Sequence, residues 1–148
     1  MSATGVFVDT WGWLALGHRK DPYHLEVKQF YQSIRDQGVP IFTSDYVLDE
    51  VFTLLFRRES APEALHFSEG LLAGATLGGL TVERITPARF TMAWHLRKQY
   101  KDKPRISFTD LTSIVIMLER GISLVLTQDE HFVQVGRGFS RVPGIAGT

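Results

Sequence analysis

At four places in this 148-residue chain, acidic residues stand where carboxylates can do chemistry together. Asp9 closes one short apolar run and Asp129 follows another; Asp45, Asp49 and Glu50 follow a third, and Asp110 opens an apolar stretch with helical spacing. Carboxylate oxygens are the ligands that Mg²⁺ and Mn²⁺ prefer. If these four groups converge, one or two such ions held between them would suit phosphodiester hydrolysis.

The elements that must position these acids can be inferred from the hydrophobic pattern. Short runs rich in β-branched residues alternate with longer segments of helical periodicity, which predicts an α/β fold with a mainly parallel sheet and helices on both faces. We expect one domain spanning residues 1–148. The predicted strands are 6–8, 41–42, 81–85, 123–126 and, at an edge, 139–142, and the predicted helices are 10–16, 22–37, 45–58, 61–77, 87–100, 109–120 and 130–135.

This arrangement brings the four acids to one edge of the sheet. Ligands of parallel α/β sheets collect beyond the carboxyl ends of the strands, where Asp9 and Asp129 are placed directly. Helices return antiparallel to the strands, so the helix starts that carry Glu50 and Asp110 lie at the same edge. Carboxylates within about 4–6 Å of one another repel and raise each other's pKa, and a divalent cation is the usual compensation.

Each acid also has a structural interpretation. Asp9 fits a helix cap, Asp129 fits a turn cap, and Ser107 with Asp110 matches a capping box. Asp49 borders the apolar arc of its helix as closely as Glu50 does, so periodicity does not choose between them. The remaining acids suit solvated faces, turns or helix ends, and Glu83 is expected to point outward from its strand.

The composition excludes several classes of protein. Sixteen basic residues balance the sixteen acidic ones, and 44% of residues are hydrophobic, which excludes a disordered chain and broad attraction to nucleic acid. The absence of cysteine excludes a disulfide scaffold, thiolate zinc sites and a cysteine nucleophile. No apolar run reaches the roughly 18 residues that cross a bilayer, and no basic segment precedes the first apolar run. We expect a cytoplasmic protein without membrane contact.

Four motifs together resemble the PIN-domain family, most closely its VapC-like toxin ribonucleases. They are spread from residue 7 to residue 132 and read V-F-V-D-T, S-x-Y-V-L-D-E, S-F-T-D and T-Q-D-x-x-F. The resemblance implies that the catalytic, metal-holding acids are Asp9, Glu50 rather than Asp49, Asp110 and Asp129. It also implies three hydroxyls that orient the carboxylates or waters: Thr10, Ser107 and Thr127.

The same resemblance implies a fold, an activity and partners. The fold would be a three-layer α/β/α PIN-like arrangement around a five-stranded sheet of order 3-2-1-4-5. The activity would be Mg²⁺- or Mn²⁺-dependent endoribonuclease cleavage, leaving 5′-phosphate and 3′-hydroxyl ends. The partners would be an RNA substrate, a second copy of the chain in a homodimer, and a cognate antitoxin. Because the acid cluster lacks a counter-charge without metal, we expect such an antitoxin to insert a cation, preferably arginine, into it.

A basic segment precedes Asp110 and surrounds Tyr100. A solvated loop is the ordinary interpretation; phosphate contacts with a base stacked on Tyr100 are the functional one. Arg57 and Arg58 are weaker candidates for the same role. The histidines show no pair at metal-ligand spacing. His131 is the histidine closest to the acids; a role in proton transfer is its functional interpretation, and a surface residue is the expectation. The cations of the basic segment are Arg97, Lys98, Lys101, Lys103 and Arg105.

Two other functions compete with the nuclease interpretation. One is an RNA-binding PIN module with little turnover inside a larger complex, which the presence of all four acids argues against. The other is a phosphatase or receiver-like protein with a strand-end phosphoryl acceptor. The sequence Asp9-Thr10-Trp11 lacks the second acid that such a phosphatase uses, and the acid pair and lysine of a receiver are not found.

Overall fold

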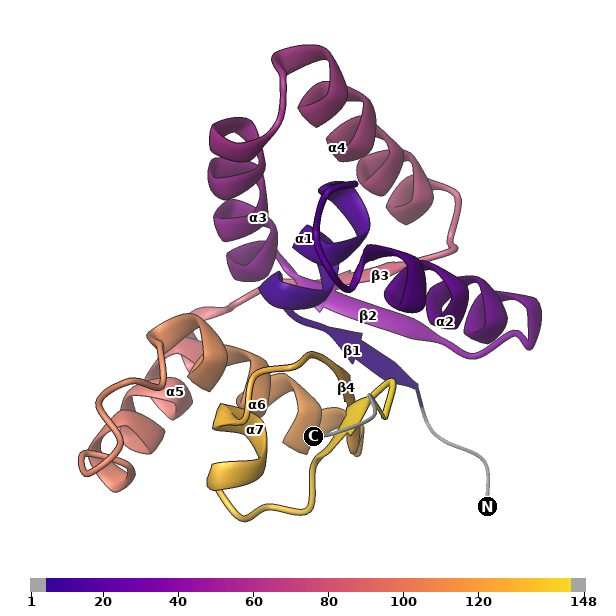
Figure 1. Cartoon of the computed structure of the whole chain (residues 1–148). Coiled ribbons are helices and arrows are strands. Elements are labelled where there is room, and N and C mark those ends of the chain that lie inside the picture. Colours follow the sequence, from indigo (N-terminus) through magenta and orange to yellow (C-terminus); the bar gives the residue numbers. More distant parts are fainter. Residues whose placement is uncertain (1–4, 145–148) are drawn as a thin grey trace.

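A five-stranded parallel sheet forms the centre of the protein, and the computed structural model describes residues 5–144. The strand order is β3-β2-β1-β4-β5, and every neighbouring pair is parallel, which confirms the predicted sheet (Figure 1). Its strands are β1 Val6–Val8, β2 Ile41–Ser44, β3 Thr81–Glu83, β4 Leu124–Leu126 and β5 Ser140–Val142.

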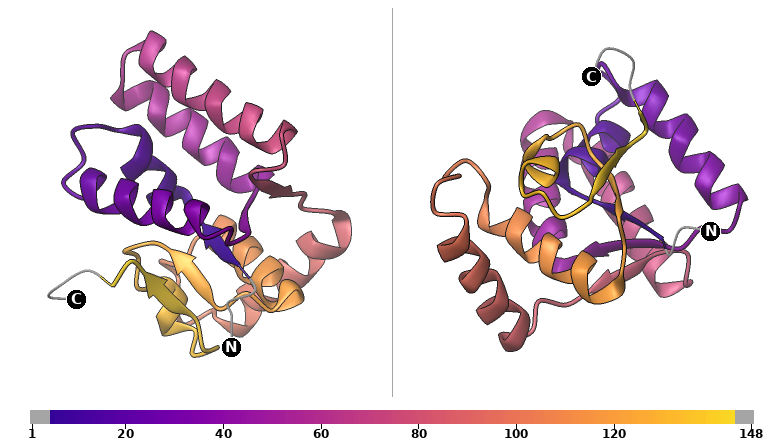
Figure 2. Two further views of the ribbon diagram at one scale, coloured as in Figure 1. Left: turned by 90° about the vertical axis from the view of Figure 1, so that its right-hand side faces the viewer. Right: turned by 90° about the horizontal axis from the view of Figure 1, so that it is seen from below.

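Helices cover both faces of the sheet and make three layers (Figure 1, Figure 2). The first four lie on one face and the last three on the other, because the chain extends the sheet on one side of β1 and then on the opposite side. None of the helices in residues 5–144 combines the length and apolar character needed to cross a membrane. The helices are α1 Thr10–Gly17, α2 His24–Asp36, α3 Asp45–Arg58, α4 Ala61–Thr76, α5 Pro87–Gln99, α6 Phe108–Arg120 and α7 His131–Gln134.

The reversal of strand order at β1 and β4 creates the crevice in which such folds bind ligands. Asp9 immediately follows β1, and Thr127 immediately follows β4. Gly12 lets α1 pack tightly here, since a Cβ at this position would lie 2.6 Å from the carbonyl oxygen of Leu126. The small residue therefore fixes the start of α1, and with it the Asp9 carboxylate, against the end of β4.

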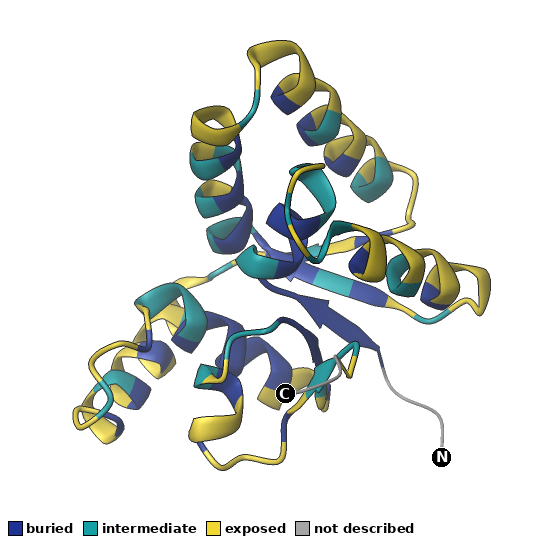
Figure 3. Cartoon of the chain, viewed as in Figure 1, coloured by how far each residue is buried: buried dark blue, intermediate teal, exposed yellow. Residues whose placement is uncertain are grey.

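The core lies between the layers (Figure 3). All three residues of β1 are buried, as expected for a central strand covered on both faces. In α6 every residue from 111 to 117 is buried, which confirms the expectation of a central, covered helix. Its two buried hydroxyls, on Thr112 and Ser113, both donate to the carbonyl of Thr109, so they leave no unmet hydrogen-bonding group in the core.

Helix boundaries differ from the sequence-based expectation at α2. The sequence predicts a start at Pro22, but the helix begins at His24, because the Asp21 carboxylate accepts a hydrogen bond from the Tyr23 amide and forms a turn. The expected strand 81–85 is shorter and ends at Glu83. The terminal sequence Gly-Ile-Ala-Gly-Thr is typical of a tail, but its last four residues, 145–148, lie outside the described residues.

The expectation that Glu83 points to solvent is wrong. Its side chain is 7% exposed and meets the guanidinium groups of Arg89 on α5, at 2.8 Å, and Arg120 on α6, at 2.6 Å. Burial alone would raise the pKa of Glu83, but the hydrogen bonds from Arg120 and Arg89 outweigh it and lower the pKa. Glu83 therefore joins the end of β3 to the two helices that carry the basic segment and Asp110.

A second acid also differs from the expectation of a solvated face. Glu59, directly after α3, is only partly exposed because its carboxylate lies 2.6 Å from Nδ1 of His18, which follows α1. This pair ties together the ends of the two helices whose starts carry Asp9 and Glu50.

Candidate active site

Asp9 is the most deeply buried of the four acids, with 3% of its surface exposed. It caps α1, since its Oδ1 accepts a hydrogen bond from the Gly12 amide at 3.0 Å, and Thr127 also hydrogen-bonds the carboxylate. Burial raises the pKa of Asp9 well above its ordinary value, and the charges of Asp110 and Asp129 raise it further, against these two hydrogen bonds. Asp9 thus does cap α1, but this capping role does not explain why Asp110 and Asp129 lie close to its carboxylate.

Glu50 reaches the same place from the second turn of α3. The hydroxyl of Thr10 donates to its Oε1 at 2.5 Å and so joins the start of α1 to α3. Asp49, one residue earlier, is exposed. The structure therefore resolves the choice that periodicity left open, because Glu50 and not Asp49 faces the other acids.

Asp110 lies in the first turn of α6 and completes the expected capping box. Its backbone amide donates to Oγ of Ser107 at 3.0 Å, and the Ser107 backbone hydrogen-bonds the Asp110 carboxylate in return. Burial raises the pKa of Asp110, with a further contribution from the charge of Asp129, whereas a hydrogen bond with His131 opposes the shift. The carboxylate thus caps its helix and also faces a second acid.

Asp129 sits in the turn between β4 and α7. Thr127 Oγ1 accepts a hydrogen bond from the Asp129 amide at 2.9 Å, and Asp129 Oδ1 accepts one from the His131 amide at 2.9 Å. This turn folds the His131 ring back toward the acids, with Nδ1 at 3.0 Å from Asp129 Oδ1 and 3.1 Å from Asp110 Oδ2. The expectation of a surface histidine is wrong: the side chain is 22% exposed and belongs to the cluster.

One cleft of about 430 Å³ collects all four predicted acids. Ligand atoms of Asp110, Asp129 and His131 lie within 4.8 Å of one another, while Asp9 and Glu50 line the same cleft outside this tighter group. Crowded carboxylates, two of which (Asp9 and Asp110) have a raised pKa, form together with one imidazole a donor set that fits a divalent cation. The cleft is lined by Asp9, Thr10, Trp11, Leu14, Asp21, Glu50, Leu54, Arg58, Arg105, Ser107, Asp110, Asp129 and His131.

Comparison with known proteins identifies this arrangement. A family model of the PIN domain matches residues 6–138. The chain belongs to the PIN-domain family. The 23S rRNA-specific endonuclease VapC20 of Mycobacterium tuberculosis, found in two strains, is 31% identical over 131 residues, which cover 88% of this chain and 94% of the relative.

A solved structure agrees with this assignment. The crystal structure of Mycobacterium tuberculosis VapC20, described as a sarcin-ricin loop cleaving toxin, superposes with a TM-score of 0.75 at 30% identity, covering 89% of this chain and 95% of that one. PIN domains are nucleases that hydrolyse RNA with the help of a metal ion. The predicted fold and the prediction of a metal-dependent ribonuclease of the toxin family are thereby confirmed.

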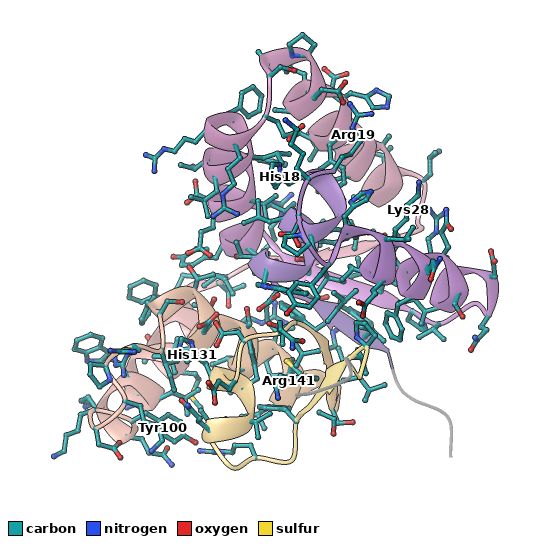
Figure 4. The ribbon with its side chains drawn as sticks, in the orientation of Figure 1. His18, Arg19, Lys28, Tyr100, His131 and Arg141 are labelled. Carbon is teal, nitrogen blue, oxygen red and sulfur yellow. The ribbon has the colours of Figure 1, made fainter. Side chains whose placement is uncertain are left out.

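The basic segment of this PIN domain is built differently from the sequence-based expectation. Arg97 is partly buried and donates to the backbone carbonyls of the loop that follows α5, so its guanidinium holds that loop in place. Tyr100, labelled in Figure 4, is 7% exposed. Its hydroxyl accepts a hydrogen bond from Arg137, whose guanidinium also lies over the ring. This burial argues against the functional interpretation of Tyr100 as a base-stacking surface.

The other cations of the segment remain available to a ligand. Lys98, Lys101 and Arg105 are exposed, and Lys103 is partly exposed and pairs with Asp102. Arg105 also lines the acid cleft, together with Arg58 from the end of α3. Positive charge thus borders the acids from two separate elements.

Proposed function

We propose that this PIN domain is the endonuclease toxin of a toxin–antitoxin pair and that it cuts a structured loop of 23S ribosomal RNA in the cytoplasm. One observation carries the proposal: acids from four separate segments border a single cleft beside two arginines. The substrate is argued from the likeness to VapC20, which spans most of both chains.

We assign the metal-holding role to Asp9, Glu50, Asp110 and Asp129, directly or through water, with Mg²⁺ or Mn²⁺ as the ion. When bound, such an ion activates water and neutralises the charge that develops on the phosphate and the leaving oxygen. The hydroxyls serve to fix the carboxylates. Thr10 holds Glu50, Thr127 holds both Asp9 and the Asp129 backbone, and Ser107 holds the helix start that carries Asp110.

RNA approaches such a centre only if its phosphates meet positive charge, because the acids themselves repel them. Arg58 and Arg105 border the cleft, which supports a role in contacting phosphates next to the scissile bond. Lys98 and Lys101 line a separate hollow of about 550 Å³ at the end of α5 and the loop after it, where they extend the contact along the RNA backbone.

Cleavage of a defined RNA tests this function. A synthetic hairpin carrying the sarcin-ricin loop sequence is incubated with the protein and Mg²⁺ or Mn²⁺, and primer extension maps the cut. We expect one dominant cut in the loop, loss of cleavage in Glu50→Gln, and normal cleavage in the matched variant Asp49→Asn. Tight binding of the hairpin without any cut, at either ion, would instead favour an RNA-binding module.

The partners follow from the same assignment. We propose that an antitoxin places an arginine among the acids and that the chain forms a homodimer. The half-exposed Phe90 and Trp94, one turn apart on α5, support an apolar contact surface. Light scattering on the purified chain tests the dimer, and a short reading frame for a DNA-binding protein directly upstream of the gene tests the pairing. A co-purified partner that avoids the acid cleft would contradict the arginine prediction.

A further inference from the structure

His131 occupies a position in the cluster that the four-acid pattern does not include. Its Nδ1 lies between a carboxylate of α6 and one of the turn after β4, at 3.1 Å from Asp110 Oδ2 and 3.0 Å from Asp129 Oδ1. Figure 4 places the ring at the start of α7, on the side that faces α6. A ring nitrogen between two acids is suited to share their ion.

The two distances agree with a common coordination shell. In an octahedral shell with bonds of about 2.1 Å, neighbouring ligand atoms lie about 3.0 Å apart. The His131 ring nitrogen therefore already stands at the spacing from each of the two carboxylate oxygens that adjacent ligands of one ion require. The same spacing also suits hydrogen bonds from the ring to the two carboxylates, so geometry alone leaves two roles: a direct ligand, or a group that only orients the acids.

The surroundings hold the imidazole in this position. The His131 amide donates to Asp129 Oδ1, which fixes the backbone beneath the ring. The next residue, Phe132, is fully buried and anchors α7 in the core. Because the side chain keeps 22% of its surface exposed, the open side of the cluster stays accessible to water and substrate.

We propose that Nδ1 of His131 binds the nuclease ion directly, together with Asp110 and Asp129, and shifts the preference of the site from Mg²⁺ toward Mn²⁺. Mg²⁺ is a hard ion that takes oxygen ligands and keeps much of its water, whereas transition-metal ions accept imidazole nitrogen readily. This inference rests on the proposed metal-dependent function and adds one ligand to it.

Pulsed electron paramagnetic resonance on the Mn²⁺-loaded full chain tests the bond itself. A directly bound imidazole gives a ¹⁴N coupling to the Mn²⁺ electron spin. We expect this coupling in the parent protein, its loss in His131→Gln, and its retention in the matched variant His95→Gln, which changes an exposed histidine on α5. The measurement on the parent needs no variant to fold.

Calorimetric titration with Mn²⁺ and with Mg²⁺ gives the second readout. We expect His131→Gln to weaken Mn²⁺ binding by about tenfold or more and Mg²⁺ binding much less. Mn²⁺ bound by the parent without ¹⁴N coupling, or equal weakening of both ions in the variant, would overturn the ligand role and leave the proposed nuclease intact. A parent protein that binds neither ion would overturn both.

Discussion

Asp110→Asn separates the two roles that the structure gives this carboxylate. The amide keeps an oxygen for the Ser107 backbone but removes one negative charge from the cluster. Ligand atoms of Asp110 and Asp129 lie within 4.8 Å, so the repulsion removed amounts to about 3 kcal/mol at an effective dielectric constant near 20. Weakening the charged hydrogen bond with His131 costs about 1–2 kcal/mol. We therefore expect the metal-free variant to be about 1–2 kcal/mol more stable than the parent.

With the ion bound, the parent rather than the variant becomes the more stable protein. At a concentration a hundred times its Kd, an ion stabilises the folded parent by about 2.7 kcal/mol. If the variant binds about a hundredfold more weakly, the same concentration stabilises it by only about 0.4 kcal/mol. For a chain of this size, one kcal/mol corresponds to roughly 2–4 °C in Tm. The parent should gain about 5–10 °C from the ion, and the variant about 1 °C.

Thermal melts in chelator and across a Mn²⁺ or Mg²⁺ titration measure both effects, and the same samples are assayed for RNA cleavage. Asp49→Asn is the matched control, because it removes one exposed charge from α3 without touching the cleft. The prediction is refuted if Asp110→Asn melts below the parent in chelator, keeps the full ion-dependent rise in Tm and still cuts RNA. That combination would mean that the carboxylate only caps α6.

Three further perturbations test the parts that hold this site. Glu83→Gln should lower the free energy of unfolding by about 2 kcal/mol at pH 7, as measured by denaturant titration. Because folding lowers the pKa of Glu83, its ion pairs stabilise the fold above the ordinary glutamate pKa of about 4.3. The difference between variant and parent should therefore shrink as the pH falls below that value. Gly12→Ala should lower the free energy of unfolding by about 3 kcal/mol, because the added Cβ forces α1 away from β4. The control Gly70→Ala, whose Cβ would have nothing within 4 Å, should leave stability unchanged or raise it. Melts followed by circular dichroism measure both variants. Replacing Lys98 and Lys101 by alanine should leave Tm unchanged but make RNA binding less dependent on salt. The slope of log K against log salt concentration should fall by about 0.7 for each phosphate of single-stranded RNA that a lysine no longer neutralises. An unchanged slope would show that neither lysine contacts the RNA.

The meeting of the acids at one edge was predictable from the sequence because backbone topology determines it, whereas the choice of Glu50 over Asp49 came from the resemblance to a family. Asp9 follows a continuous apolar run of a buried strand, and in a parallel sheet every such end lies at one edge. Asp110 opens a helix that returns to that edge. These inferences need only the order of strands and helices, which hydrophobic periodicity and the resemblance to a family supply.

The misassigned residues depend on side-chain partners that are distant in sequence. Glu83 is buried because two arginines from α5 and α6 reach it, and nothing in the local pattern indicates those contacts. Tyr100 is buried by packing and by Arg137, although it lies within a segment rich in cations. His131 lies two residues after Asp129, but only the turn before α7 directs its ring back into the cluster.

The acid cleft, as we propose, holds a divalent ion with which the protein hydrolyses RNA. The most direct test is single-turnover cleavage of one labelled hairpin by protein stripped of metal with a chelator, with and without added Mn²⁺, followed by analysis of the product ends. We expect no cleavage in chelator, recovery on adding the ion, and products with 5′-phosphate and 3′-hydroxyl ends. Cleavage that persists in chelator and leaves 2′,3′-cyclic phosphate ends would contradict this mechanism.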